Sequence, residues 1–153
     1  MPAPSSPREV FERLTHGIAT WNLAQLPDLY AEDCLVEHPF APPGPARRIE
    51  GRAAIRRHFA QAADGPLRMR PGVLAIHETT DPEVVIGEVT QHFRMLDTGR
   101  EFTADAIFVL RVRGGLIVTS RDYANHLSIA HRAGWLPQLI EALDAESGAT
   151  GLA

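Results

Sequence analysis

Apolar residues in the first part of the chain recur every three or four positions, which is the spacing of one face of an α-helix. Over residues 7–22 this pattern is carried by Val10, Phe11, Leu14, Ile18 and Trp21. Pro7 suits the first turn of a helix, and Ser6 before it can accept a hydrogen bond from a free backbone N–H group. The same spacing returns over residues 52–63, RAAIRRHFAQAA, so the sequence predicts two amphipathic helices in this part of the chain.

The segment between these helices has a shorter and less regular pattern. Leu26 and Leu29 indicate a short helix that ends near residue 33, and residues 34–38 then have the apolar character of a strand. Residues 39–51, PFAPPGPARRIEG, hold four prolines and two glycines. Because proline and glycine interrupt regular structure, we expect an irregular surface loop there.

From residue 67 onward the hydrophobic period shortens to two, which is typical of β-strands. Four strands are predicted, over residues 67–79, 83–96, 100–113 and 116–125. The sequences Asp97-Thr98-Gly99 and Gly114-Gly115 suit tight turns. The last three strands are therefore expected to form an antiparallel meander.

After His126 the pattern becomes helical again, with Leu136, Leu139, Ile140 and Leu143 on one face. Helices followed by a long meander predict an α+β fold. We expect a single domain over residues 1–153, with residues 1–6 and 145–153 flexible.

The last predicted strand, LIVTSRDYAN, ends on a carboxylate although it begins as an apolar element. Side chains alternate along a strand, so Val118, Ser120, Asp122 and Ala124 share one face. If that face lines a cleft, Asp122 can exchange a proton with a bound molecule. The structural alternative is an ion pair between Asp122 and an arginine at the rim of the sheet.

The residues that oppose Asp122 depend on the turn at Gly114-Gly115. A two-residue turn would place Asp105 on the same face and make a carboxylate pair, whereas a glycine bulge would place Ala104 and Ala106 there. Periodicity alone leaves both arrangements open.

Composition and charge exclude several classes of function. All 15 basic residues are arginine, so Schiff-base and lysine general-base chemistry are absent. The formal charge is −4 and the arginines are scattered, which disfavours nucleic-acid or membrane partners and favours a small molecule. Cys34 has no partner for a disulfide and suits a buried apolar position. We find no signal pattern and no apolar run near the ~20 residues that span a bilayer, so we expect a cytoplasmic protein.

Short catalytic motifs are also missing from the chain. It has no CxxC, HExxH or GxSxG sequence and no glycine-rich phosphate loop, so any chemistry must come from dispersed residues. We expect neither a metal nor a cofactor. A dispersed zinc site of His38, Asp122 and His126 is the metal-binding alternative.

The order of elements and the segments GRAAIRRHF, LDTGREF and SRDYANHL resemble the nuclear-transport-factor-2-like superfamily. Within it, the chain is similar to the SnoaL-like polyketide cyclases and the limonene-epoxide-hydrolase group, from about Glu9 to about Leu143. The resemblance implies a cone in which N-terminal helices pack on a strongly curved, mainly antiparallel sheet that encloses an apolar cavity. It also implies a homodimer. Under this resemblance Ala104 and Ala106 face the cavity and Asp105 does not.

The epoxide hydrolase pattern places a catalytic aspartate at Asp122, but its other catalytic positions differ in this chain. The arginine of that group falls at Val89 and its second aspartate at Gln91, while its water-holding tyrosine and asparagine fall at Val36 and His38. Epoxide opening by that mechanism is therefore not expected. In the SnoaL-like cyclases an aspartate acts as acid and base, and the phenazine-biosynthesis A/B proteins also have an acid at the position of Asp122.

The resemblance and the residues together predict a cofactor-independent acid/base enzyme of secondary metabolism, such as antibiotic biosynthesis. It would be a cyclase, isomerase or dehydratase that acts on a polyketide- or terpenoid-like small molecule. The expected catalytic residues are Asp122, His38 and Gln91. The expected substrate-binding residues are Ile18, Val36, Phe59, Val89, Phe93, Ala104, Ala106, Ala124 and His126. The alternatives are a non-catalytic small-molecule-binding protein of the same fold and a variant hydrolase in which Asp122 and His38 activate water.

Several of these residues also have structural interpretations. His38 can cap the proline-rich loop that follows it, and Gln91 can be a hydrogen-bonded core amide. His126 either forms the mouth of the cavity or starts the C-terminal helix, with Asn125 as the cap.

Overall fold

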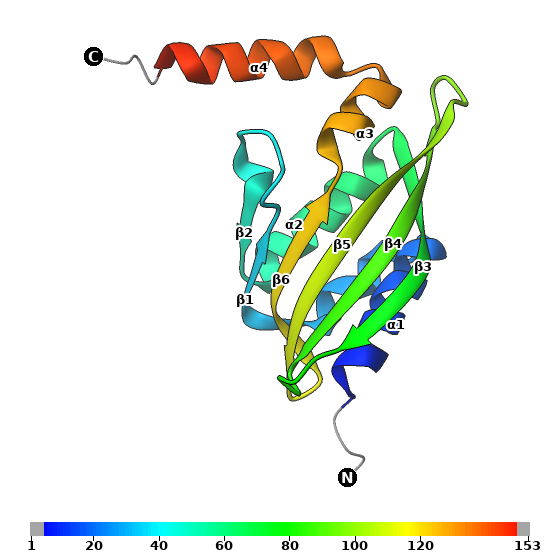
Figure 1. Cartoon of the computed structure of the whole chain (residues 1–153), viewed down its shortest axis with the longest axis vertical. Helices are drawn as coiled ribbons and strands as arrows, with labels where there is room; N and C mark the ends of the chain where they lie inside the picture. Colours follow the sequence, from blue (N-terminus) through cyan, green and yellow to red (C-terminus); the bar gives the residue numbers. More distant parts are fainter. Residues whose placement is uncertain (1–4, 150–153) are drawn as a thin grey trace.

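One curved sheet of six strands forms the body of the protein (Figure 1), in a computed structural model that describes residues 5–149. The strands are β1 (Tyr30–Glu37), β2 (Arg48–Glu50), β3 (Leu67–Glu78), β4 (Val84–Met95), β5 (Glu101–Arg113) and β6 (Leu116–Ala124). They lie in the order β2-β1-β6-β5-β4-β3, and only β1 and β6 run parallel among these neighbours. The sheet is open between β2 and β3. The predicted α+β fold with a mainly antiparallel sheet is confirmed.

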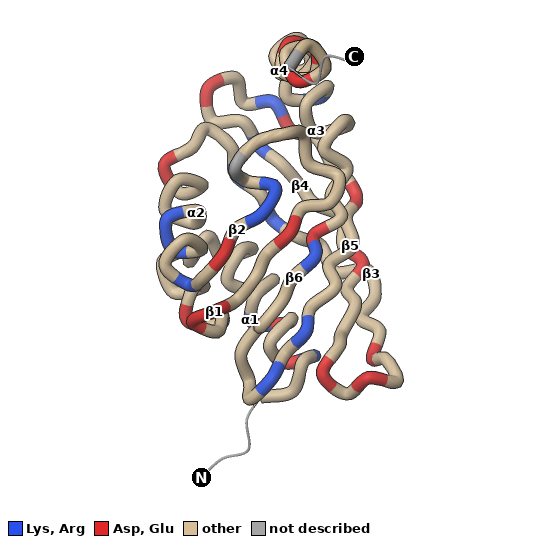
Figure 2. Tube along the Cα trace, turned by 90° about the vertical axis from the view of Figure 1, so that its left-hand side faces the viewer, with Lys and Arg blue, Asp and Glu red and all other residues tan. Residues whose placement is uncertain are grey.

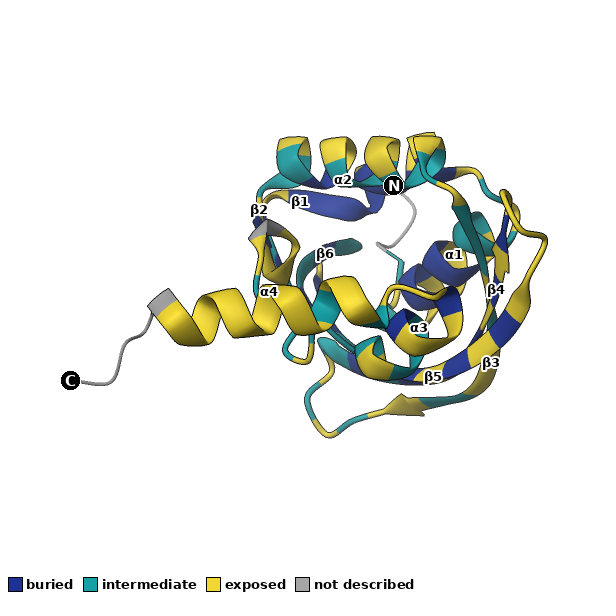
Figure 3. Ribbon diagram, turned by 90° about the horizontal axis from the view of Figure 1, so that it is seen from above, coloured by how far each residue is buried: buried dark blue, intermediate teal, exposed yellow. Residues whose placement is uncertain are grey.

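The helices pack against the concave side of this sheet or follow its last strand. They are α1 (Pro7–Ala19), the 3₁₀ helices η1 (Leu23–Leu29) and η2 (Pro45–Arg47), α2 (Arg52–Asp64), α3 (His126–Ala133) and α4 (Leu136–Ala149). Seen from above, β3, β4 and β5 curve around α1, while α2 lies over β1 (Figure 3). The predicted C-terminal helix is thus two helices, and α4 projects away from the sheet with most of its residues exposed.

Helix α1 begins as the sequence predicts and packs closely on β4. Ser6 Oγ accepts a hydrogen bond from the Glu9 N–H group, and the Glu9 side chain accepts one from the Ser6 N–H group. The fully buried ring of Phe11 lies directly over Gly87 of β4. A Cβ atom at Gly87 would come within 2.0 Å of Phe11 Cζ, so only glycine allows this approach.

Two predicted boundaries between the helices are wrong. Residues 48–50 form β2 and pair with residues 35–37 of β1, although the segment was expected to be irregular. The four prolines all precede Arg48, so they do not remove hydrogen-bond donors from this short strand. Strand β1 also begins earlier than predicted, because Tyr30 already pairs with Ile117 of β6.

The register of β5 and β6 follows neither of the two simple alternatives. Gly114 and Gly115 form a two-residue turn with positive φ at both residues, and Arg113 pairs with Leu116. A separate irregularity then leaves Val118 without a partner between the pairs Val112/Ile117 and Arg111/Thr119. This bulge shifts the alternation by one residue, so Ile117 is buried with Ser120 and Ala124.

As a result, Ala104 and Ala106 face the interior, whereas Asp105 is exposed and accepts a hydrogen bond from Thr90. Cys34 is buried, as expected.

Charged residues are spread over the outside of the protein. Arginines and acidic residues are interspersed along β1, β2 and β6 (Figure 2), and Glu37 lies between Arg48 and Arg121 as an ion-pair partner of both. Within residues 5–149, no helix has the length and apolar character needed to cross a membrane.

Candidate functional site

The parallel pairing of β1 and β6 brings together two side chains that lie far apart in the sequence. Glu37, the last residue of β1, pairs with Arg121 of β6, so the residues that follow them are also neighbours. His38 Nε2 lies 3.4 Å from Asp122 Oδ2. The side chains are 15% and 17% exposed, respectively. The ends of these two strands therefore bring an imidazole and a carboxylate together, both largely shielded from solvent.

The second ring nitrogen of His38 fixes how this pair is protonated. His38 Nδ1 lies 2.7 Å from the carbonyl oxygen of Ala46, which can only accept, so Nδ1 carries a hydrogen. Nε2 then faces a carboxylate oxygen, and this contact is favourable only if a proton lies between the two groups. The pair therefore holds one exchangeable proton.

Electrostatics favour the protonated form of His38. Burial acts to lower the pKa of His38, but the hydrogen bond and negative charge of Asp122, helped by the Ala46 carbonyl, outweigh it and raise the pKa. His38 also bonds the loop through its backbone, because its N–H group donates to Arg47. It therefore anchors the proline-rich loop and pairs with Asp122 at the same time.

Ser120 orients the other oxygen of the carboxylate. Its hydroxyl donates a hydrogen bond to Asp122 Oδ1, and Ser120 is itself 2% exposed. Each oxygen of Asp122 thus has its own partner, which fixes the plane of the carboxylate in the pocket.

A cavity of about 360 Å³ lies in front of this pair on the concave side of the sheet. Nine of the predicted site residues line it: Ile18, Val36, His38, Phe59, Gln91, Phe93, Asp122, Ala124 and His126. Most of the other lining residues are apolar, among them Leu14, Ile55, Leu67, Met69, Phe108 and Ile129. A largely apolar cavity with a few convergent polar groups is the usual form of a small-molecule site.

Val89, Ala104 and Ala106 do not line this cavity, contrary to their predicted role as substrate-binding residues. They face the interior, but Val89 is only 1% exposed within the main core. Ala104 is covered by a second cluster that includes Phe93 and Phe102.

Two buried polar atoms in this region have no hydrogen-bond partner within residues 5–149. They are Gln91 Oε1 and His126 Nε2, and both residues line the cavity. An unpaired buried polar atom costs about 1–3 kcal/mol, so a bound molecule that supplies the missing partner gains this energy. The buried Gln91 amide thus has an oxygen without a partner, whereas its structural alternative was a fully hydrogen-bonded core amide.

Three histidines surround the carboxylate. The ring centroids of His58 and His126 lie 6.0 and 6.3 Å from that of His38. Burial, followed by the repulsion from a charged His38, lowers the pKa of both His58 and His126. Of the three histidines, His38 therefore holds a proton most readily. The Asn125 side chain accepts a hydrogen bond from the Ser128 N–H group, so Asn125 caps α3, which was one of the two alternatives for this segment.

Three polar residues of the site were not predicted from the sequence, namely Tyr30, His58 and Ser120. Ser120 shares a strand face with Asp122, and His58 follows Ile55 at helical spacing, so both had a signal. Tyr30 was expected to lie in the short helix that ends near residue 33, so its position in β1 was not anticipated. Burial, and then the charge of Asp122, raises the pKa of Tyr30, which keeps its hydroxyl protonated as a possible donor.

The metal-binding alternative has no counterpart in the geometry. Among residues 5–149, no three histidine, cysteine or acidic side chains, including those of His38, Asp122 and His126, come together in a way that could hold a metal ion.

Comparison with known proteins assigns the family. Residues 11–120 match the family described as the SnoaL-like domain, so the chain belongs to the SnoaL-like family of the nuclear-transport-factor-2-like superfamily. An uncharacterized PhzA/B-like protein of Pseudomonas aeruginosa is 36% identical over 100 residues, which cover 65% of this chain and 70% of the relative.

Solved structures have the same fold. The structure of a supposed isomerase from Bacillus subtilis superposes with a TM-score of 0.73 and 27% identity, over 83% of this chain and 91% of the other. A supposed polyketide cyclase from Pseudomonas putida superposes with a TM-score of 0.72 and 15% identity, over 84% and 98% of the two chains. The second likeness concerns the fold alone.

Proposed function

We propose that this protein is a cofactor-independent acid/base enzyme that rearranges a largely apolar small molecule, as a cyclase, isomerase or dehydratase. The observation that carries the proposal is the contact between His38 Nε2 and Asp122 Oδ2 at the wall of an apolar cavity, with His38 Nδ1 held by the Ala46 carbonyl oxygen. Such a pair offers a base and an acid within one site, which is what a proton transfer within a substrate needs.

The contacts suggest a role for each group. With the proton on His38, the carboxylate of Asp122 is free to take a proton from a carbon next to a carbonyl group. The Gln91 amide and the His38 imidazolium then stabilise the negative charge that develops on the carbonyl oxygen. His38 or the newly protonated Asp122 returns a proton at another atom, which completes an isomerisation, a ring closure or a loss of water.

The lining favours a polyketide- or terpenoid-like substrate. Its walls are aromatic and aliphatic, and the polar atoms gather around Asp122, His38 and Gln91. The fold shared with a supposed isomerase and a supposed polyketide cyclase supports the same class of reaction, and with it a role in secondary metabolism. Epoxide opening is less well supported, because the described residues that line the cavity include no arginine.

Deuterium exchange tests the proposal without knowledge of the natural substrate. Apolar cyclic ketones are incubated with the protein in heavy water, and NMR follows the loss of the hydrogens next to the carbonyl group. We expect the protein to accelerate this exchange and the Asp122→Asn variant to lose the acceleration. Equal exchange by the wild type and a folded Asp122→Asn variant would contradict the proposal.

We also propose a homodimer through the outer face of the sheet. Two apolar side chains are exposed on the strands of this face, namely Leu74 and Ile107, with 69% and 43% exposure. Arg111 and Arg113 are not free for such a contact, because both pair with Glu83 of the same chain. Light scattering should give the mass of a dimer for the wild type and that of a monomer for the Ile107→Asp variant. A monomeric wild type would contradict the proposal.

A further inference from the structure

A second hollow adjoins the cavity, beside α1 and the turn between α2 and β3. Its volume is about 310 Å³, roughly that of ten water molecules in the liquid. Trp21, Leu23, Ala62 and Pro66 form its outer wall, and every lining residue except His58 is apolar or glycine. We call this hollow the side chamber.

The side chamber and the cavity meet at one layer of side chains. Ile18, His58, Phe59, Leu67 and Met69 line both spaces. Leu67 and Met69 are flexible at several side-chain torsions, so small rotamer changes can widen the passage between the two spaces. A molecule whose polar end lies at Asp122 therefore has an apolar space available for its other end.

The wall of the side chamber contains a strained residue. Trp21 has φ of 56°, the one positive value outside glycine among residues 5–149. The Asn22 N–H group donates to Gly17 and the Trp21 N–H group donates to Ile18, which is the Schellman pattern that ends many helices. Glycine is favoured at this position, because a side chain there costs roughly 1–3 kcal/mol. Trp21 packs against the main core, which offsets part of this cost.

Arg68 holds the Trp21 indole in place. Its guanidinium carbon lies 4.8 Å from the ring centroid, and its Nη1 donates to the carbonyl oxygens of Gly65 and Leu67. Trp21 at the end of α1 is thereby connected to the turn between α2 and β3. The indole forms a fixed apolar wall for whatever occupies the side chamber.

We infer that the side chamber binds the apolar tail of the substrate and that Trp21 determines the tail length the enzyme accepts. The substrate class is an elongated amphipathic ketone or hydroxy-ketone, with its polar head at Asp122 and an aliphatic or ring tail against Trp21. This inference rests on the proposed function for the position of the head, but the tail site stands on its own geometry.

A homologous series of methyl ketones tests the inference. Calorimetry gives the dissociation constants of the 2-alkanones from 2-hexanone to 2-undecanone for the full-length protein. Each added methylene should tighten binding by roughly two- to fourfold until the side chamber is full. In the Trp135→Phe variant, Trp21 is the remaining tryptophan, and its fluorescence should change only with the longer ketones.

Two variants and a matched control locate the effect. Ala62→Phe fills the side chamber and should weaken 2-undecanone binding by roughly tenfold or more, while binding of 2-hexanone stays within about twofold. Trp21→Gly removes the wall and relieves the backbone strain, so it should fold well and show the same selective loss. Ala60→Phe, on the exposed side of α2, should behave as wild type.

The same chain-length dependence in wild type, Ala62→Phe and Trp21→Gly would overturn the inference. The Asp122→Asn variant separates it from the proposed function, since it should lose proton exchange and keep the chain-length dependence. Chain-length dependence without any hydrogen exchange in the wild type would support the side chamber as a tail-binding site and contradict the proposed enzymatic activity.

Discussion

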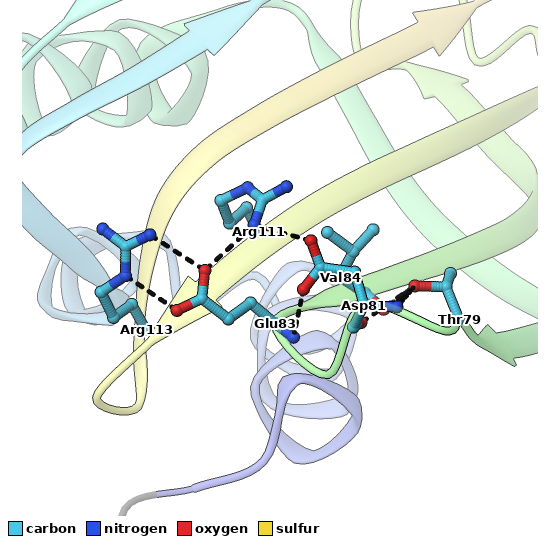
Figure 4. Close-up of polar contacts among 6 residues, drawn as sticks. All are labelled: Thr79, Asp81, Glu83, Val84, Arg111 and Arg113. Carbon is cyan, nitrogen blue, oxygen red and sulfur yellow. Dashed lines mark hydrogen bonds and ion pairs between the residues drawn. The ribbon is translucent and has the colours of Figure 1, made fainter.

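Asp122 and Glu83 are carboxylates at opposite ends of the same sheet, and their partners differ in kind. Glu83 accepts hydrogen bonds from Arg113 Nε at 2.8 Å and from Arg111 Nη1 at 3.0 Å, and Arg111 also pairs with Asp81 (Figure 4). Asp122 contacts a histidine and a serine inside a cavity. The first arrangement is an ion-pair cluster at the surface, and the second contains a group that can give up its proton near neutral pH.

This difference decides what each carboxylate can do. The hydrogen bonds from Arg113 and Arg111 lower the pKa of Glu83 to about 2, and arginine does not release its proton in return. Glu83 therefore stays charged and connects the turn between β3 and β4 to β5. A histidine partner, by contrast, leaves a mobile proton at Asp122. The arginine ion pair that was the structural alternative for Asp122 occurs at Glu83.

The largest expected effect separates the two carboxylates directly. Asp122→Asn removes the base and should reduce ketone hydrogen exchange by about 10²–10⁴-fold. Glu83→Gln should leave the exchange rate within about twofold, because it lies outside the cavity. NMR exchange rates of both variants, with circular dichroism as a check of folding, measure this contrast. Similar losses in both variants would refute the separate roles.

The next effect concerns the partner of the carboxylate. His38→Gln removes the exchangeable proton and should slow exchange by about 10²-fold, the low end for a general acid. His92→Gln is the matched control, since His92 is exposed on the face of β4 opposite to Gln91 and the cavity. If His38→Gln retained full activity, Asp122 would act without a proton donor at this position.

A smaller effect is expected at Ser120, which orients Asp122 without facing the substrate. Ser120→Ala removes one buried hydrogen bond to a carboxylate and should reduce exchange by about tenfold. Because the acid/base pair itself remains, the shape of the pH profile should be retained. A changed pH dependence would show that Ser120 takes part in the proton transfer.

The smallest effect is on stability at the other end of the sheet. The pKa of Glu83 is lower in the folded chain than in the unfolded one, so its contribution to stability is present above about pH 4.5 and is lost as the pH falls toward about 2. Urea unfolding of wild type and Glu83→Gln should therefore differ modestly at pH 7 and converge at low pH. A difference that persists at low pH would point to packing instead of charge.

The sequence predicted the helices and long strands because their hydrophobic periods are regular over many residues. It did not predict β2, since a three-residue strand has no detectable period, or the bulge at Val118, since one extra residue leaves the local composition unchanged. Asp122 could be predicted as a site residue because it is a carboxylate at the end of an apolar strand. Its place beside His38 followed only from the family resemblance, because parallel pairing of β1 and β6 joins residues 84 positions apart.

The pH titration of His38 tests the central claim most directly and requires no substrate. The raised pKa of His38 means that its pair with Asp122 stabilises the fold fully below pH 6.5 and loses this effect as the pH rises through the folded-state pKa. Nitrogen-15 NMR of the imidazole should give a midpoint above 6.5 in the wild type and a lower one in Asp122→Asn. A wild-type midpoint at or below 6.5, or one unchanged in Asp122→Asn, would contradict the shared proton.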